Sequence, residues 1–241
     1  MRWSAPTALL AAALSFGAIA AHAEDTLNPL HFQSQGTFGT YDVAALQRGF
    51  LVYQTVCASC HSANALHYRD LQALGFSPDQ VASIASNVKL PGGPATLDDS
   101  FKNPYPDPAA AAAAFGGAVP PDLSNIVNAR PKGLDYVFHL LTGYVDAPAD
   151  VTLLPAHYFN LAYPGNQLAM PAPLKDDQVE YADGTKATVA QEASDVTAFL
   201  GWAADPNLSV RREIGVRAGL FLLFLAIIAI ATKRRIWRET V

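Results

Sequence analysis

The chain has 241 residues, of which 51% are hydrophobic and 15% are charged, and its formal net charge at pH 7 is −5. Residues 24–210 carry 19 acidic and 8 basic side chains, a net of −11, whereas residues 211–241 carry 2 acidic and 7 basic ones, a net of +5. The acidic body argues against nucleic acid as a partner and favours a basic one. Its length of roughly 185 residues is enough for one core.

The first residues have the three parts of a secretory signal peptide. Arg2 is an early charge, an apolar run follows from Ala5 to Ala20, and "AHA" precedes Glu24. We therefore expect residues 1–23 to be a signal peptide. A mitochondrial transit peptide would be richer in Arg and Ser, so the bacterial periplasm is the expected destination.

The other end of the chain carries a second apolar segment, Ile214–Thr232. At the helical rise of 1.5 Å per residue it is roughly 28 Å long, close to the hydrocarbon thickness of a bilayer. The alternative is a buried helix of a soluble core, because Arg217 interrupts the run. However, Arg217 can snorkel, and "KRRIWR" adds four positive charges and Trp237 directly afterwards.

These features predict four parts of the chain. They are a signal peptide at residues 1–23, a periplasmic domain at 24–210, a transmembrane anchor helix at 211–232 and a basic tail at 233–241. The positive-inside rule places the tail in the cytoplasm and residues 24–210 in the periplasm.

The stretch "TVCASCHSAN" holds both cysteines of the chain. Cys57, Cys60 and His61 form the C-x-x-C-H pattern of c-type haem attachment, in which each thiol adds to one haem vinyl group and the imidazole faces the iron. In an oxidising compartment a Cys pair could instead be a disulfide or a thioredoxin-type redox pair. A structural zinc site would need more ligands than this cluster offers.

The iron of such a haem can take a second axial ligand. Met170, in "YPGNQLAMPAPL", is the one methionine after the signal peptide. Methionine opposite histidine is typical of electron carriers with a raised potential, whereas an open site would suggest sensing or oxygen chemistry. The pattern favours Met170 and a carrier. The remaining alternatives are an open site, His31, His67, His139 and His157.

The apolar periodicity predicts a mainly α fold with long loops. The expected helices are Val43–Cys57, Gly133–Thr142 and Val189–Ala204. Asp42 is the expected cap of the first helix, and Thr188 with Gln191 predicts a capping box at the start of the last one. Proline-rich stretches separate the helices and read as loops, with a six-alanine run as a weak helix nucleus.

Several segments together resemble the cytochrome c1 family, the haem subunit of the cytochrome bc1 complex. They are "QRGFLVYQTVCASCHSA", "NPYPDPAAAAAAFGGAVPPDLSNIV", "ARPKGLDYVFHLLTGY", "YPGNQLAMPAPL", "DVTAFLGWAADP" and "KRRIWR". The likeness runs in order from about residue 36 to residue 238. It implies a cytochrome c-type helical haem domain with enlarged loops and one C-terminal transmembrane helix.

The resemblance also implies the cofactor and the residues that hold it. One haem c would be attached covalently through Cys57 and Cys60, with His61 and Met170 as axial ligands of the iron. Arg130 would pair with a haem propionate, since a guanidinium can bind both oxygens of a carboxylate. Further positions that match the haem pocket are Pro120, Pro121, Tyr136 and Leu140.

The implied function is electron transfer in a respiratory or photosynthetic chain. The subunit would accept electrons from the Rieske iron–sulfur protein and pass them to a soluble cytochrome c, beside cytochrome b in the membrane. It would not be a complete enzyme alone, because quinol would be oxidised in cytochrome b. Alternatives are a membrane-anchored cytochrome c that donates to a terminal oxidase, a haem-based sensor, and a disulfide-bonded structural protein.

One departure from the family pattern concerns the loop before Met170. Some bacterial members have an additional disulfide near the methionine ligand, and this chain has no cysteine left to form it. We therefore expect packing, the turn chemistry of "YPGN" or other contacts to hold this loop.

Overall fold

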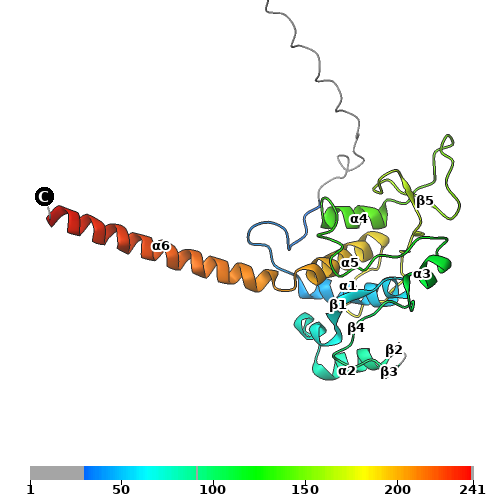
Figure 1. The fold of residues 1–241 in the computed structure, drawn as a ribbon, viewed down its shortest axis with the longest axis horizontal. Coiled ribbons are helices and arrows are strands. Elements are labelled where there is room, and N and C mark those ends of the chain that lie inside the picture. Colours follow the sequence, from blue (N-terminus) through cyan, green and yellow to red (C-terminus); the bar gives the residue numbers. More distant parts are fainter. Residues whose placement is uncertain (1–29, 91, 240–241) are drawn as a thin grey trace, which may run out of the picture.

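A computed structural model of the chain describes residues 30–90 and 92–239, and the predicted signal peptide lies outside these residues. The described part is a mainly helical domain from which one long helix projects (Figure 1). The predicted fold class, a helical domain with long loops and a C-terminal apolar helix, is thereby confirmed.

Two long helices of the domain begin at the predicted caps. Helix α1 spans Val43–Thr55, and the side chain of Asp42 accepts a hydrogen bond from the backbone N–H of Ala44. Helix α5 spans Val189–Ala204, and Thr188 Oγ1 accepts from the N–H of Gln191 at 3.2 Å. The predicted capping box is only half formed, because Gln191 Nε2 donates to Asp195 of the next turn.

Helices α1 and α5 cross at a very short distance. A Cβ added to Gly49 of α1 would lie 2.0 Å from the carbonyl oxygen of Asp195 in α5, so only glycine fits this crossing. Arg48 beside it donates two hydrogen bonds to the carboxylate of buried Asp195, at 2.9 and 3.0 Å, and a third to Asp183. A bidentate pair of this kind fixes geometry as well as adding energy. It sets the relative position of the two helices.

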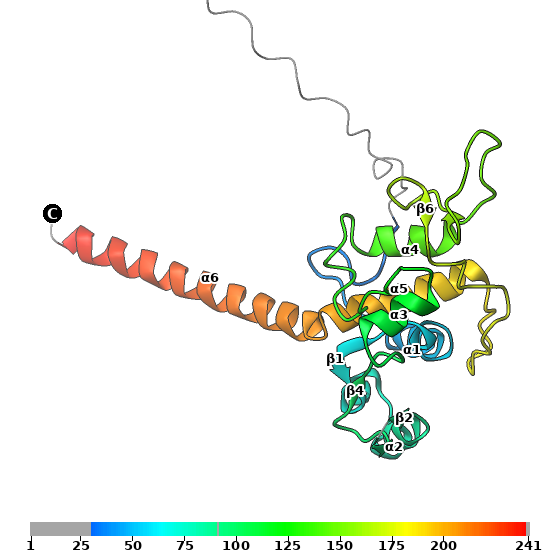
Figure 2. The ribbon, with the colours of Figure 1, turned by 45° about the vertical axis from the view of Figure 1, so that its right-hand side comes forward.

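Helix α4, Leu134–Thr142, packs on the opposite side of α5, so that α5 lies between α4 and α1 (Figures 1 and 2). The contact needs a small residue on α5, because a Cβ at Gly201 would approach Leu134 Cδ2 within 2.8 Å. Helix α4 begins one residue later than predicted, with Gly133 as its N-cap at φ 55°. Tyr136 and Val137 of this helix are buried.

The proline-rich segments contain more regular structure than the sequence patterns predicted. The six-alanine run forms helix α3, Pro108–Ala114. The helices that were not predicted are η3, Tyr68–Leu74, and α2, Pro78–Ser86. The short antiparallel strand pairs are β1 (Ala63–His67) with β4 (Ser100–Phe101), β2 (Lys89–Leu90) with β3 (Gly93–Pro94), and β5 (Tyr158–Phe159) with β6 (Gln167–Leu168).

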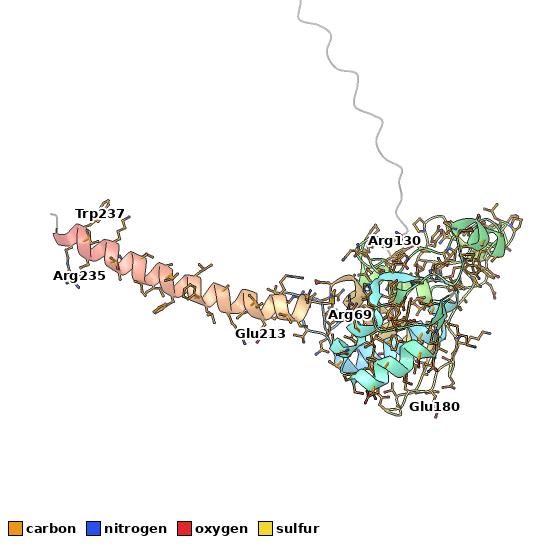
Figure 3. All side chains as sticks on the ribbon, turned by 60° about the horizontal axis from the view of Figure 1, so that its bottom comes forward. Arg69, Arg130, Glu180, Glu213, Arg235 and Trp237 are labelled. Atoms are coloured by element: carbon orange, nitrogen blue, oxygen red, sulfur yellow. The ribbon has the colours of Figure 1, made fainter. Side chains whose placement is uncertain are left out.

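The long C-terminal helix α6 spans Leu208–Glu239 and begins three residues before the predicted anchor. Its length and composition suit a membrane span, and its apolar window has no side chain buried against the rest of the protein. This separates it from the buried core helix that the sequence left as an alternative. Figure 3 shows Glu213 near the domain, with Arg235 and Trp237 at the far end of the helix.

The base of α6 is tied to the domain by specific hydrogen bonds. Arg212 donates to the carbonyl oxygens of Ser34 and Gly39, which hold the loop before α1 against the helix. Arg211 forms a two-bond pair with Asp205, just after α5. The first residues of α6 therefore belong to the folded domain.

We expect the stability of a shortened chain to depend on this base. A chain that ends after Asn207 should unfold at lower urea concentration than one that ends after Glu213, with a difference of about 1–3 kcal/mol in the free energy of unfolding, because Arg212 bonds to two carbonyls. In the longer form, Arg212→Ala should reproduce most of the loss. Arg211→Ala, which removes an exposed pair, should cost less. Equal stability of the two fragments would contradict this assignment.

Candidate cofactor site

One cavity of about 680 Å³ lies between the end of α1, helices α4 and α5, and two long loops. Its volume is within the range of about 300–1,000 Å³ that is usual for cofactor sites. Leu200 of α5, Tyr136 of α4 and Val56, the residue directly after α1, contribute to its walls, which are mostly apolar. The sequence-predicted residues at this cavity are Cys57, Cys60, His61, Pro120, Pro121, Arg130, Tyr136, Leu140 and Met170.

Helix α1 delivers the two cysteines to one side of this cavity. The helix ends at Thr55, two residues earlier than predicted, and Cys57–Ser59 continue as a 3-10 turn, η2. The backbone N–H groups of Cys60 and His61 both donate to the carbonyl oxygen of Cys57, at 3.0 and 2.9 Å. The turn thus brings both sulfurs and the imidazole to the cavity. The two cysteines are free thiols and do not form a disulfide with each other.

Burial, together with the nearby Cys60, raises the pKa of the Cys57 thiol to about 12. The group is therefore protonated at neutral pH. Addition of a thiol across a vinyl group places its S–H proton on the terminal carbon and forms one C–S bond, so the protonated form contains all the atoms that thioether attachment requires.

The imidazole of His61 is oriented by a backbone carbonyl. Its Nδ1 lies 2.7 Å from the carbonyl oxygen of Pro121, which can only accept, so Nδ1 carries the hydrogen. The Nε2 lone pair is then available to a metal, in the arrangement that is usual for metal-binding histidines. Burial lowers the pKa of His61, although the bond to Pro121 opposes this effect, so the neutral ring is favoured.

The loop that supplies this carbonyl is held by Asp122. Its carboxylate accepts hydrogen bonds from Ser62 Oγ at 2.7 Å and from the N–H groups of Asn64 and Ser124 at 2.8 and 2.9 Å. These bonds tie the residues after His61 to those around Pro121. The sequence analysis did not single out Asp122. Its position directly after the "PP" dipeptide was the one available signal.

Met170 contributes to the cavity from a continuous segment. Leu168, Ala169 and Pro171 line the cavity beside it, and the segment follows strand β6. Met170 is partly buried. The thioether therefore belongs to the same cavity as the cysteines and the imidazole.

The four alternative histidines differ in whether they line the cavity. His157 also lines the cavity, but its Nδ1 lies 2.9 Å from the carbonyl oxygen of Pro155 in the same loop. His31 is exposed, His67 lies near Asp70, and His139 stacks edge-on against Phe138; none of these three is among the lining residues. Of the alternatives, the structure brings only His157 to the cavity.

The remaining predicted residues lie at different depths. Tyr136 is buried in the wall, whereas Arg130 lies at the surface, where its Nη1 donates to the neighbouring carbonyl of Ala129 (Figure 3). This placement suits a cation that faces the exposed edge of a cofactor. Lining residues that sequence reasoning missed are Phe115, Val119, Ile126, Tyr163 and Gln167.

The donor set and the shape of the cavity fit a haem. Two thiols and an imidazole with a free Nε2 come from one turn, a thioether comes from a separate loop, and apolar side chains fill most of the wall between them. A porphyrin is a large apolar ring with charged propionates at one edge, and Arg130 provides a cation at the surface of this cavity. No group of three or more His, Cys, Asp or Glu side chains that could hold a bare metal ion occurs in residues 30–90 and 92–239.

Comparison with known proteins finds relatives that match most of the chain. Residues 32–240 match the model of the cytochrome C1 family. The chain is 40% identical to "Cytochrome c1" of Rhodospirillum rubrum, over 95% of this chain and 92% of that protein. It is 43% identical to the mitochondrial "Cytochrome c1-2, heme protein" of Solanum tuberosum, over 83% and 81%. It is 39% identical to "Cytochrome b/c1" of Bradyrhizobium diazoefficiens, over 85% of this chain and 34% of that longer protein.

We expect the Asp122 contacts to stabilise the fold in a pH-dependent way. Burial pushes the pKa of Asp122 up, but the hydrogen bonds from Asn64, Ser124 and Ser62 outweigh it and the pKa is lowered. A lowered folded-state pKa stabilises above the unfolded value of about 3.9, and this stabilisation is lost as pH falls through the folded value. Asp122→Asn should therefore have a lower free energy of unfolding than the parent at neutral pH. The difference between the two free energies should become smaller in acid.

Unfolding free energies measured between about pH 2 and pH 6 test this expectation. Asp150→Asn is the matched control, because Asp150 is exposed in a loop and has no hydrogen bond among the contacts of the described residues. A gap for Asp122→Asn that stays constant with pH would show that the carboxylate charge is not what holds the loop.

Proposed function

The chain belongs to the cytochrome c1 family, the haem subunit of the cytochrome bc1 complex, and on this premise we propose that it holds one haem c and transfers single electrons. Cys57 and Cys60 attach the haem through thioether bonds. His61 and Met170 would ligate its iron. When bound, the haem supplies a one-electron redox couple.

One observation carries this proposal. A single cavity is lined by the thiols of Cys57 and Cys60, by an imidazole whose Nδ1–H is held by a carbonyl, and by the thioether of Met170. Met170 is about 110 positions from the other three residues in the sequence, and the fold brings it to them. A structural disulfide protein would have no use for the other two groups.

The residues around the ligands have separate roles. The carbonyl of Pro121 holds the imidazole of His61 in one tautomer and increases its basicity. The thioether of Met170 favours the reduced iron and raises the potential. Arg130 pairs with a propionate at the surface, while Tyr136 and Leu140 form part of the wall that keeps water away from the haem.

We further propose that electrons come from the Rieske iron–sulfur protein and leave to a soluble cytochrome c, with cytochrome b as the membrane neighbour. Membership of the family supports this assignment. The name of the Bradyrhizobium relative, which joins cytochrome b and c1 in one protein, supports the neighbour. The net charge of −11 on residues 24–210 supports a basic acceptor.

The proposed topology follows from the two ends of the chain. Helix α6 anchors the protein in the bacterial inner membrane, and its basic end, with Lys233, Arg234, Arg235 and Arg238, stays in the cytoplasm. Trp237 and Lys233 stack there, with Nζ 5.0 Å from the ring centroid. The haem domain then lies in the periplasm, where residues 1–23 would direct it.

Substitution of the thioether tests the proposed ligation. Met170→Leu keeps an apolar side chain of similar volume but removes the sulfur, so the midpoint potential should fall, within the range of about 0.8 V that axial ligands command. The ferric charge-transfer absorption of sulfur ligation should disappear in the same variant. Haem staining on a denaturing gel should persist in it, because Cys57 and Cys60 still hold the haem.

His157→Leu is the matched control for this experiment, because His157 lines the same cavity. It should leave the absorption band and the potential unchanged. If the parent protein lacks the sulfur band, and His157→Leu changes the midpoint potential while Met170→Leu does not, His157 is the ligand and the assignment of Met170 is wrong.

Electron transfer to the soluble partner should depend on ionic strength. Because the haem domain is acidic, reduction of a basic soluble cytochrome should slow as salt rises, since charges more than about 8–10 Å apart are screened at physiological salt. Stopped-flow mixing at several salt concentrations measures the second-order rate constant. An acidic soluble cytochrome serves as the control and should show the opposite trend. A rate constant for the basic partner that does not vary with salt would remove electrostatic steering from the proposal.

A further inference from the structure

The segment that ends at Met170 is part of a ribbon made of strands β5 and β6, to which residues 144–145 add a first, singly bridged strand. After α4 the chain forms a bridge between Tyr144 and Asn160, and the N–H of Val145 donates to the carbonyl of Phe159. Strand β5 then pairs with β6, with Tyr158 opposite Leu168 and Phe159 opposite Gln167. Met170 follows β6 after one residue. The ribbon therefore links the end of α4 to the methionine.

Asn160 lies at the centre of this ribbon and is completely buried. Its Nδ2 donates to the carbonyl oxygen of Leu140 in the last turn of α4, at 2.8 Å. Its Oδ1 accepts from the N–H groups of Ala162 and Tyr163, at 2.9 and 3.2 Å. The amide thus satisfies three backbone groups, and it is an amide, rather than a disulfide, that joins the loop to the helix.

The third strand is fastened to Asn160 through its backbone. The N–H of Asn160 donates to the carbonyl of Asn166 at 3.0 Å, and Asn166 Nδ2 donates back to the carbonyl of Asn160 at 2.9 Å. Between them the "YPGN" turn closes with a bond from the N–H of Asn166 to the carbonyl of Tyr163, with Gly165 at φ 78°. Proline followed by glycine suits a turn of this kind.

Tyr144 connects the first strand directly to the methionine. Its hydroxyl donates to the carbonyl oxygen of Met170 at 3.0 Å, across the ribbon. A carbonyl oxygen can only accept, so the phenolic O–H is the donor. The carbonyl of Met170 therefore has a fixed partner on the first strand.

Close packing leaves little freedom where the ribbon leaves α4. A Cβ at Gly143 would lie 2.6 Å from the carbonyl of His139 and 3.2 Å from Asn160 Oδ1. The N–H of Leu161 also donates to the carbonyl of Gly143 at 2.9 Å. Asn160 therefore sits against the chain at the exit of α4 with almost no space between them.

We propose that Asn160 and Tyr144 are positioning residues for the Met170 ligand, and that together they hold its loop closed without a disulfide. This inference rests on the proposed ligation of iron by Met170. Asn160 joins the ribbon to α4, whose side chains form the cavity wall, and Tyr144 fixes the backbone of the ligand itself. The loop that carries the thioether is thus tied to α4, the helix that also forms part of the cavity wall.

Loosening this network should open the sixth coordination position for part of the time. An external ligand binds only when the thioether has left, so its apparent affinity is proportional to the open fraction. A measured affinity for an external ligand therefore reports how firmly the loop holds Met170. Overall stability does not enter this quantity directly.

Imidazole binding to the ferric, full-length protein in detergent is the experiment. Tyr144→Phe removes one hydroxyl and should raise the apparent association constant of imidazole about two- to tenfold, the effect of one net hydrogen bond. Asn160→Ala should raise it at least as much. In both variants the sulfur charge-transfer band should weaken and the midpoint potential should fall. Tyr158→Phe, the same deletion on an exposed tyrosine of the same ribbon, is the control and should change none of these.

Met170→Leu distinguishes the two levels of the proposal. If it raises imidazole affinity strongly while Tyr144→Phe and Asn160→Ala match the Tyr158→Phe control, Met170 is the ligand and the positioning inference is wrong. A lower melting temperature in Asn160→Ala without a change in imidazole affinity would also show that the positioning inference is wrong. If Met170→Leu itself changes neither imidazole affinity nor the band, the proposed ligation fails, and the inference fails with it. Should Asn160→Ala not fold, Tyr144→Phe decides.

Discussion

The crossing of α1 and α5 at Gly49 is the constraint on which the rest of the domain depends. The carbonyl oxygen of Asp195 occupies the space that any side chain at residue 49 would need, and Arg48 binds the carboxylate of the same aspartate through two hydrogen bonds. Backbone contact and charge pairing thus act at one point. Helix α1 ends just before the attachment motif, and α5 provides part of the cavity wall. This crossing therefore fixes the position of Cys57, Cys60 and His61 relative to that wall.

The two proposed axial ligands are held by different means. His61 belongs to a turn that continues directly from α1, and a single carbonyl, of Pro121, orients its ring. Met170 lies in the loop region between α4 and α5 and depends on a ribbon whose strands are only two residues long. Such strands have little stability of their own. Buried side-chain hydrogen bonds, above all those of Asn160, take the place of strand length.

The base of α6 shows that hydropathy alone does not locate the boundary between the folded domain and the C-terminal helix. The apolar window identifies a helix that could span a membrane, yet this helix starts before the window, and Arg212 bonds to backbone carbonyls of the loop before α1. Because the helix is continuous from the folded domain into the apolar segment, the amino-acid composition does not mark where the domain ends. The domain is therefore joined to the apolar helix through defined contacts.

The sequence by itself determined the helices with clear caps and the apolar C-terminal helix, and it predicted the attachment motif and Met170 as haem ligands. Each of these depends on residues close together in the chain or on a residue type that occurs once after residue 23. Only the tertiary structure decided which histidine shares the cavity with Met170, that Asp122 and Pro121 orient His61, and that Asn160 and Tyr144 hold the loop. The hydrogen bonds among them join residues 20 to 60 positions apart. Periodicity and spacing carry no signal for such pairs, since a hydrogen bond across a fold depends on how distant segments pack and not on their order.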